Sequence, residues 1–413
     1  MKSIENLLIK TGKAAIQLRN ASDKQIRSVL LKLADALEEN MPALLKANKK
    51  DLLAQDAGNP RNDRLLLSEQ RVRNIAVSIR KISKLPNPSG RVLDKHTLRN
   101  GLRVKKIAVP LGVVGAIYES RPNVTFDIAA LCIRSQNGCV LKGSQEADHT
   151  NKAAIRIIKN VLKENGMPED CVTLLPSERE TVQHLFTATK HLDVLIPRGS
   201  DSLIQFVRKN SLVPVIETGA GVCHIYIERD AALDKAVNIV VNAKVSRPSV
   251  CNAVDTVLVD EKVAPAFFKK LQPAFDRYKV EMIAETKAYK LLKDYPLLKK
   301  AGTADFDTEF LSLRCAVKVV KDIDEALEHI HRHSTKHSEA IVSENKKHCR
   351  RFLQEVDAAA VYTNASTRFT DGEELGLGAE IGISTQKLHA RGPFALEKLV
   401  TEKWLLEGDG QVR

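Results

Sequence analysis

One cysteine near the middle of the chain has neighbours typical of a nucleophile. Cys251 lies in the segment 246–252, which follows an expected helix at 232–245 and precedes an expected strand at 255–259. A loop cysteine with an arginine such as Arg247 nearby can have a lowered pKa, and the thiolate is the form that attacks carbonyl carbons. A buried, inert thiol is the commoner role of cysteine, so the local sequence leaves both interpretations open.

Polar residues also follow the expected strand at 107–118. The carboxyl ends of parallel strands are where α/β proteins bind ligands. At this end Asn123 could donate its side-chain amide to a developing oxyanion, and Arg121 could bind a phosphate or a carboxylate. The structural alternative is an Asx-type turn beside a solvated arginine.

A second strand end, at 197–200, combines a glycine with the expected start of a helix. Exposed N–H groups at a helix start favour an anion, and a glycine lets the anion approach closely. An ordinary N-cap formed by Ser200 explains the same residues. The segment is therefore a candidate anion site with a structural alternative.

Histidines recur near residue 330. Three of them, His329, His333 and His337, are spaced to share one face of a continuous helix, with His331 between them. Carboxylates and cysteines at ligand spacing are missing around them, and the Ser-Thr pair at 334–335 predicts that the helix ends before the last histidine. We therefore predict no metal site here.

The stretch 370–393 is rich in glycine, threonine, serine and basic residues. It has the composition of a long ordered loop, and such loops are often functional. Its side chains Lys387, His389 and Arg391 could bind anions. A lid or connector with solvated charges is the alternative interpretation.

The elements that must position these residues alternate between strands and helices over most of the chain. Helices are predicted at 22–37, behind a capping-box pattern at Ser22, and at 65–85. The Asn-Gly pair within 98–104 predicts a two-residue hairpin turn. The expected strands are 107–118, 138–142, 172–175, 193–197, 213–217, 224–227, 255–259, 316–320, 338–342 and 359–362, with helices such as 151–164 and 200–209 between them. This alternation predicts parallel βαβ units and an α/β fold of two domains with a cleft between them.

Composition limits the class of protein. The 413 residues suggest two or three domains, and an apolar fraction of 43% excludes a wholly disordered chain. The net charge of +13 is spread without blocks of five like charges, and the aromatic content is only 4%. We therefore predict no nucleic-acid binding and expect a field that attracts anionic small molecules.

Several other classes are disfavoured by what the sequence lacks. No apolar stretch is long enough to span a bilayer, and the first residues lack the order of a signal peptide. Seven cysteines without a pairing pattern do not indicate a disulfide framework. We therefore expect a cytoplasmic protein without a membrane partner. The G-x-G-x-x-G fingerprint, the Walker A loop, H-E-x-x-H and G-x-S-x-G are also missing.

Several strings, taken together, resemble the γ-glutamyl phosphate reductase (glutamate-5-semialdehyde dehydrogenase) family of the aldehyde dehydrogenase superfamily. The resemblance runs in order over nearly the whole chain, at 47–52, 110–115, 119–124, 196–199, 247–252, 364–372 and 384–393. It implies the NADPH-dependent reduction of L-glutamyl 5-phosphate to L-glutamate 5-semialdehyde with release of phosphate, in proline biosynthesis. It also implies a thioester on Cys251, with the Asn123 amide and the Cys251 backbone N–H as oxyanion donors.

The resemblance assigns roles to further residues, and it implies no metal. The cofactor NADPH (NADP after reaction) would be bound without the usual glycine fingerprint, by Lys142, Ser144, Gln145, Gly199, Ser200 and Glu309. The candidate residues for binding the substrate phosphate and α-carboxylate are Arg121, Arg368, Lys387, His389 and Arg391.

The chain departs from the family pattern at three places. The segment 142–146 replaces the more usual Arg-Gly-Gly-Lys-Glu, which bears on the preference for NADPH over NADH, and Asp255 replaces glutamate. Glu217 stands where hydrolytic aldehyde dehydrogenases have a water-activating base. A hydrolytic dehydrogenase using Cys251 and Glu217 is therefore the alternative function, although we favour a relic or a substrate contact for Glu217.

The resemblance also implies a domain division. A cofactor-binding domain would comprise 1–92, 110–217 and about 388–400, and a catalytic domain 218–387. The hairpin at 93–109 and the C-terminal strand at 401–413 would mediate oligomerisation, giving a homodimer or a larger assembly. A candidate partner is glutamate 5-kinase, which would supply the labile acyl phosphate.

Overall fold

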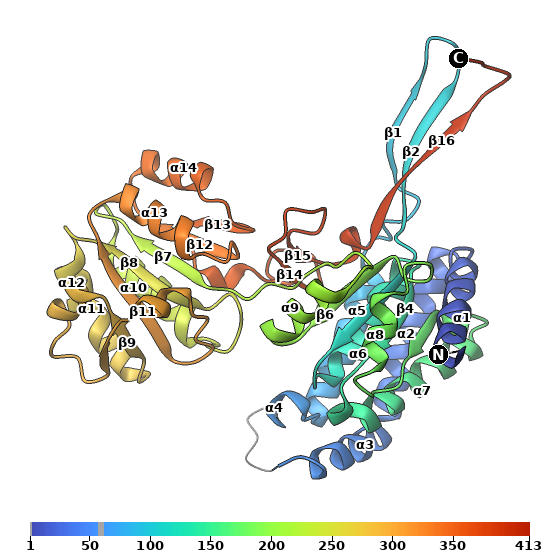
Figure 1. Ribbon diagram of the computed structural model, residues 1–413, viewed down its shortest axis with the longest axis horizontal. Coiled ribbons are helices and arrows are strands. Elements are labelled where there is room, and N and C mark those ends of the chain that lie inside the picture. Colours follow the sequence, from blue (N-terminus) through green and yellow to red (C-terminus); the bar gives the residue numbers. More distant parts are fainter. Residues whose placement is uncertain (1, 57–61) are drawn as a thin grey trace. The chain divides into compact units, whose positions relative to one another are not determined.

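The structure is a computed structural model that describes residues 2–56 and 62–413. The chain divides into two compact units, each of which contains α-helices and β-strands (Figure 1). The first comprises the described residues up to Thr218 together with Leu377–Gly382 and Phe394–Arg413, and the second comprises Gly219–Gly376 and Ile383–Pro393. The chain thus returns to the first unit twice, at Leu377 and at Phe394.

The first unit contains a four-stranded parallel sheet with the strand order β5-β4-β3-β6. All of the residues of its central strand β3 are buried, which explains the continuous apolar run in the sequence. The strands are β3 (Val113–Tyr118), β4 (Gly138–Lys142), β5 (Val172–Leu174) and β6 (Val194–Arg198). The helices α6 (Pro122–Arg134), α7 (Asp148–Glu164) and α8 (Thr181–Phe186) connect these strands, and α9 (Asp201–Asn210) follows β6.

Five helices precede this sheet in the described part of the chain. They are α1 (Lys2–Leu18), α2 (Asp23–Glu39), α3 (Met41–Leu53), α4 (Asn62–Leu65) and α5 (Glu69–Lys84). The capping box predicted at Ser22 is confirmed, since the Ser22 N–H donates to the Gln25 side-chain oxygen at 2.9 Å. The predicted apolar face of α2 is buried throughout. The helix expected at 65–85 begins only at Glu69, because Ser68 caps it.

The single strand predicted at 107–118 is wrong, because the segment is two strands in different sheets. Strand β2 (Arg103–Pro110) ends at a proline, which has no N–H for a ladder, and β3 begins at Val113. Between them Gly112 has φ +134°, and a Cβ there would overlap the Asp193 carboxylate, which accepts from the Val113 N–H at 2.7 Å. Only glycine allows this turn.

The strand predicted at 213–217 is also wrong. Only Val215 pairs, in an isolated bridge with Leu195 of β6. Pro214 has no N–H to donate. The pairing is therefore limited to two hydrogen bonds, from the Leu195 N–H to the Pro214 carbonyl and from the Ile216 N–H to the Leu195 carbonyl.

A three-stranded antiparallel ribbon leaves the first unit. It contains β1 (Val92–Thr97), β2 and β16 (Val400–Glu407), in that order (Figure 1). The predicted hairpin is confirmed, but its loop is longer than a two-residue Asn-Gly turn: the Leu98 N–H donates to the Leu102 carbonyl, so residues 99–101 form the loop, in which Gly101 takes φ +85°. Several large apolar side chains of the ribbon are exposed, including Trp404 and Leu406.

The second unit contains a seven-stranded parallel sheet in the order β10-β9-β11-β8-β7-β12-β13. Its strands are β7 (Cys223–Ile227), β8 (Val254–Asp260), β9 (Glu281–Ala284), β10 (Leu298–Lys300), β11 (Arg314–Val320), β12 (Ser338–Val342) and β13 (Ala360–Thr363). The sequence did not predict β9 and β10, which have four and three residues and lie at one edge of the sheet.

Helices cover both faces of this sheet. They are α10 (Leu233–Val245), α11 (Ala264–Arg277), α12 (Thr286–Leu291), α13 (Ile323–His333) and α14 (Lys346–Glu355). Ile225 packs in the core with α10 and α11, whereas the next residue, Tyr226, packs with α13 and α14. This alternation is the pattern of a doubly covered parallel sheet, so the α/β prediction is confirmed.

The rest of the described chain is irregular or short. The loop at 370–393 contains the two-stranded pair β14 (Gly382–Ser384) and β15 (Gly392–Phe394).

All seven cysteines are free thiols, as the absence of a pairing pattern predicted. Of the helices in the described ranges, none combines the length and apolar character needed to cross a membrane.

Candidate functional site

Cys251 lies in a tight turn just before β8, where the backbone is closely packed. Its side chain is half-buried. Its carbonyl oxygen accepts a hydrogen bond from the Cys223 thiol at 3.2 Å, and a Cβ on Gly221 would overlap the same oxygen. The Cys251 backbone can therefore take this position only because residue 221 has no side chain.

The next residue, Asn252, ties this turn to the loop that follows β13. Its side-chain nitrogen donates to the carbonyl of Thr370 at 2.9 Å, and its own carbonyl accepts from the Thr367 hydroxyl at 2.7 Å. The Asn252 side-chain oxygen accepts from the guanidinium of Arg368, whose Nε also donates to Ser246 at 3.1 Å. Both ends of the Cys251 turn therefore hold Arg368.

The environment of Arg368 is charged and partly dry. Burial lowers the pKa of Arg368; among the neighbouring charges, Asp371, the Cys251 thiol and Glu374 raise it and Arg247 lowers it. Two arginines therefore lie within electrostatic range of one another beside the cysteine. Positive charge near a thiol favours the thiolate.

Two of the other predicted substrate residues are bound to a carboxylate of the same unit. Asp357 accepts from Lys387 Nζ and from Arg391 Nη2, each at 2.7 Å. These hydrogen bonds lower the pKa of Asp357 to about 2. An anion at Lys387 or Arg391 would therefore compete with Asp357. His389 lies on the exposed stretch between them.

Glu309 is held by a backbone N–H, and the residue after it is held by a buried carboxylate. Its carboxylate accepts from the Gly221 N–H at 2.9 Å. The following N–H, of Phe310, donates to Asp255 at 3.2 Å. Burial raises the pKa of Asp255 to about 6 although Lys244 beside it acts in the opposite direction.

The remaining predicted residues belong to the first unit. Asn123 is the second residue of α6, and Arg121 stands at the N-cap position of that helix. The Asn123 side-chain nitrogen donates to Asp127 Oδ2 at 3.0 Å. Burial raises the pKa of Asp127 to about 6, against the opposing effects of Asn123 and Arg198.

Lys142, Ser144 and Gln145 follow one another at the end of β4. Lys142 Nζ donates to the carbonyl of Ser177 at 2.9 Å, and burial lowers the pKa of this lysine. The Ser144 hydroxyl lies 3.3 Å from that of Ser120. Gln145 begins the short helix that leads into α7. The three residues thus line the carboxyl end of one parallel strand.

The helix start at Gly199 and Ser200 faces an anion that belongs to the protein itself. Glu119 accepts from the Ser200 N–H at 2.9 Å and from its hydroxyl at 2.6 Å. A Cβ on Gly199 would lie 2.7 Å from the Glu119 carboxyl carbon. The helix start therefore holds a negative group, and a phosphate there would have to share or replace the place of Glu119.

The histidine cluster is spread over two elements. Helix α13 ends at His333, as predicted, so His337 lies outside it. His329 stacks on His333 with ring centroids 4.4 Å apart, and His333 bonds Asp307 at 2.7 Å. These contacts give His329 and His333 structural partners.

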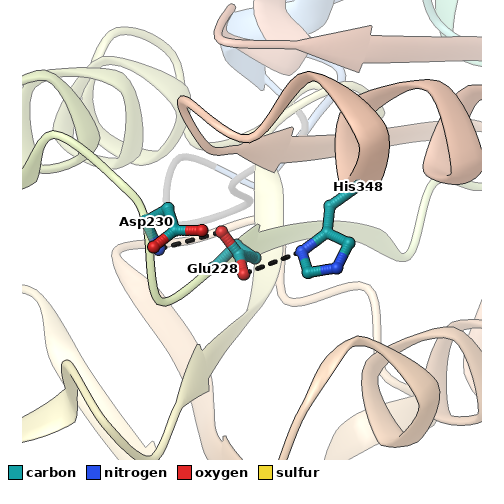
Figure 2. A group of neighbouring side chains, drawn as sticks. All are labelled: Glu228, Asp230 and His348. Carbon is teal, nitrogen blue, oxygen red and sulfur yellow. Dashed lines mark hydrogen bonds and ion pairs between the residues drawn. The ribbon is translucent and has the colours of Figure 1, made fainter.

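Glu228, Asp230 and His348 lie close enough together to consider a metal ion, and Figure 2 shows the Glu228 carboxylate between the other two. Their hydrogen bonds account for this arrangement: Glu228 accepts from the Asp230 N–H at 2.9 Å and from Ser343 at 2.7 Å, and it lies 3.0 Å from His348 Nδ1. We interpret the group as a satisfied buried carboxylate.

Four residues that contact the candidate site residues or their supports were missed by the sequence reasoning. Asp127 lies four residues after Asn123, a spacing that places both on one helix face and could have been noticed. Asn252 lies within the family-like segment 247–252, but no role was predicted for it. Glu119 and Lys244 meet their partners only through the tertiary structure, and no local pattern indicates them.

Comparison with known proteins gives a consistent picture. A model of the aldehyde dehydrogenase family matches residues 2–289. The chain is 50% identical over 415 aligned positions to the γ-glutamyl phosphate reductase of Chlorobium phaeobacteroides, covering 100% of this chain and 99% of that one. The crystal structure of γ-glutamyl phosphate reductase from Thermotoga maritima is 41% identical, with a TM-score of 0.95 over 99% of both chains. An acetylating aldehyde dehydrogenase from Geobacillus thermoglucosidasius shares the fold at 18% identity, with a TM-score of 0.71 over 100% of this chain and 98% of that one.

Proposed function

Because the chain belongs to the aldehyde dehydrogenase family, we propose that it is an NADPH-dependent oxidoreductase acting on L-glutamyl 5-phosphate. The products would be L-glutamate 5-semialdehyde and phosphate, a step in proline biosynthesis. The full-length similarity to γ-glutamyl phosphate reductases supports the substrate. The single observation that carries the chemistry is the turn at Cys251. Gly221 packs closely against its backbone, and the next residue, Asn252, bonds Arg368.

Cys251 is the proposed nucleophile. Its thiolate attacks the acyl carbon, a C–S bond forms, and the C–O bond to phosphate breaks with its electron pair on the phosphate. The product of this step is a thioester on Cys251. The positive charges of Arg247 and Arg368 favour the thiolate before attack and the departing anion after it.

Two donors are proposed for the oxyanion that forms on the acyl oxygen. They are the Asn123 side-chain amide and the Cys251 backbone N–H. A fixed donor of this kind contributes on the order of 3 kcal/mol to stabilisation of the transition state. The packing of Gly221 against the Cys251 carbonyl supports a fixed backbone at this position.

The residues proposed for NADPH fit an anionic dinucleotide. Lys142, Ser144 and Gln145 provide a cation and polar groups at the end of a parallel strand, where such ligands bind. Gly199 and Ser200 open α9, whose start already holds a carboxylate, and Glu309 offers oxygens to ribose hydroxyls. NADPH, when bound, supplies the hydride that reduces the thioester.

Arg121, Arg368, Lys387, His389 and Arg391 are the proposed substrate-binding residues. Their charges suit the phosphate and the α-carboxylate of the substrate. Arg368 has the strongest support, because its guanidinium is bonded to the residue that follows Cys251. Lys387 and Arg391 are held as a pair by Asp357 and would exchange this partner for the substrate.

The ribbon of β1, β2 and β16 is the proposed oligomerisation element. Trp404 is 51% and Leu406 59% exposed on its outer strand. Apolar side chains this exposed are typical of surfaces that pair with another chain. A homodimer or larger assembly through this ribbon, and delivery of the acyl phosphate by glutamate 5-kinase, are the proposed partnerships.

The reverse reaction tests the proposal. Purified protein is mixed with glutamate semialdehyde and NADP, with and without inorganic phosphate, and NADPH absorbance is followed. We expect NADPH formation only with phosphate, and none with Cys251→Ala. Phosphate-independent formation would indicate hydrolysis instead, and wild-type rates from Cys251→Ala would exclude this cysteine as the nucleophile. Cys349→Ala is the matched control, since it removes another half-buried thiol of the second unit that has no place in the proposed chemistry.

A further inference from the structure

The amide of Asn123 is held by a carboxylate on its own helix. Asn123 Nδ2 donates to Asp127 Oδ2 at 3.0 Å, from the second residue of α6 to one helical turn further along. Asn123 is exposed, whereas Asp127 is partly covered. The bond therefore links an exposed amide to a carboxylate in a drier environment, where hydrogen bonds are stronger.

The direction of this bond determines what the amide can do. An ionised carboxylate can only accept, so it selects the nitrogen end of the Asn123 amide. An amide nitrogen carries two hydrogens, and one of them remains available for a second acceptor. Without the carboxylate, the amide could rotate and present its oxygen, which would repel an oxyanion.

We propose that Asp127 is a positioning residue that keeps the nitrogen end of Asn123 directed at the reacting oxygen. This inference rests on the proposed function, in which Asn123 is an oxyanion donor. Arg198 on β6 is the charged group that faces Asp127, and it favours the ionised carboxylate. Asp127 thus acts through Asn123 and does not touch the substrate.

The protonation state of Asp127 adds a second consequence. Burial raises the pKa of Asp127 to about 6. A protonated carboxyl can donate, so it can bond the oxygen end of the Asn123 amide and turn the nitrogen away. The positioning is therefore present above pH 6 and is lost as the pH falls below it.

A double-mutant cycle tests the coupling. Asp127→Ala, Asn123→Ala and the double variant are compared with wild type by kcat and KM in the reverse reaction. Removal of one oxyanion donor lowers kcat by about 10²–10³-fold, and we expect Asp127→Ala to give a substantial part of this loss with KM little changed. In the Asn123→Ala background, Asp127→Ala should cause no further loss. Additive losses, or a wild-type kcat in Asp127→Ala, would overturn the inference.

The dependence of kcat on pH provides a second test, with a variant that keeps the volume of the Asp127 side chain. Asp127→Asn cannot change its charge, so the acid limb near pH 6 should be absent from its kcat profile and present in wild type. A limb that persists unchanged in Asp127→Asn would contradict the inference. Glu69→Gln, which removes the negative charge from an exposed i,i+4 pair on α5, is the control and should leave kcat and its profile unchanged.

A titration separates failure of this inference from failure of the proposed function. The Asp127 carboxyl carbon is followed by ¹³C NMR in wild type and in Asn123→Ala. The hydrogen bond from Asn123 lowers the pKa of Asp127, so its loss should move the titration to higher pH. An unchanged titration overturns the coupling even if the enzyme has another substrate. A wild-type protein inactive in the reverse reaction would contradict the proposed function instead.

Discussion

Lys244 and Asp255 form an ion pair inside the second unit, with Lys244 Nζ 3.2 Å from Asp255 Oδ1 and both side chains almost fully buried. Lys244 also donates to the carbonyl of Ser312 at 3.4 Å, and Asp255 accepts from the Phe310 N–H. The pair therefore holds the backbone on the carboxyl side of Glu309. Asp255, which replaces the glutamate more usual in the family, thus helps to hold the backbone next to Glu309, a proposed cofactor-binding residue.

Breaking this pair should cost stability and cofactor affinity. Lys244→Met leaves Asp255 buried without its partner, which we expect to lower the free energy of unfolding by about 3–5 kcal/mol. The raised pKa of Asp255 means that the folded state favours the protonated form, so its contribution to stability is full below pH 4 and is lost as the pH rises through 6. The deficit of Lys244→Met should therefore grow from pH 5 to pH 8, as measured by chemical denaturation.

The apolar double variant Lys244→Met/Asp255→Leu should recover much of this stability, while the KM for NADP stays raised because Phe310 and Ser312 are released. Asp234→Asn is the control, since its pair with Lys270 is exposed and should change stability by less than about 0.5 kcal/mol. A wild-type KM in the double variant would show that the pair does not support Glu309.

Gly221→Ala should reduce catalysis more than stability. The added methyl group would overlap the Cys251 carbonyl, so the turn must shift together with the Cys251 N–H. We expect kcat to fall by on the order of 10²-fold, the effect of a displaced oxyanion donor. Gly12→Ala, in helix α1 with open space around it, should instead stabilise the protein by about 1 kcal/mol and leave kcat unchanged. A wild-type kcat in Gly221→Ala would show that the turn tolerates the methyl group.

Glu217 should be dispensable for the phosphate-dependent reaction. Its carboxylate lies 3.6 Å from Arg208 Nη1 on α9, which holds it as an ion-paired group. We expect Glu217→Gln to change the rate of NADPH formation with phosphate by less than about twofold. A general base contributes about 10²–10⁴-fold, so a loss of that size would show that Glu217 acts as a base in this reaction.

Asp357 should stabilise the protein in a pH-dependent manner. Its two hydrogen-bonded cations lower its pKa from 3.8 to about 2, so its contribution to stability is present above pH 4 and is lost as the pH falls through 2. Wild type should therefore be more stable than Asp357→Asn at pH 6, and the difference between their unfolding midpoints should shrink between pH 4 and pH 2.5. If the difference between the two unfolding midpoints stayed constant over this range, the charge of the Asp357 carboxylate would contribute nothing to stability.

The local elements of this protein were predictable because each has a short-range cause. The apolar period of α2 and the cap at Ser22, the Asn-Gly turn between β1 and β2, and the alternation of strands and helices all depend on residues close together in the chain. The turn that carries Cys251 was placed correctly between α10 and β8 for the same reason. The catalytic and binding roles assigned from the family resemblance stay predictions.

The tertiary structure decided what depends on distant residues. The apolar run at 107–118 has no internal sign of the turn at Gly112, since the turn exists because Asp193, eighty residues later, accepts from Val113. Glu119 at the start of α9, Asp357 between Lys387 and Arg391, and Lys244 beside Asp255 are likewise pairings between separate elements. A side chain's type and spacing limit what it can bind, but its partner is set by which strands and helices the packing brings together.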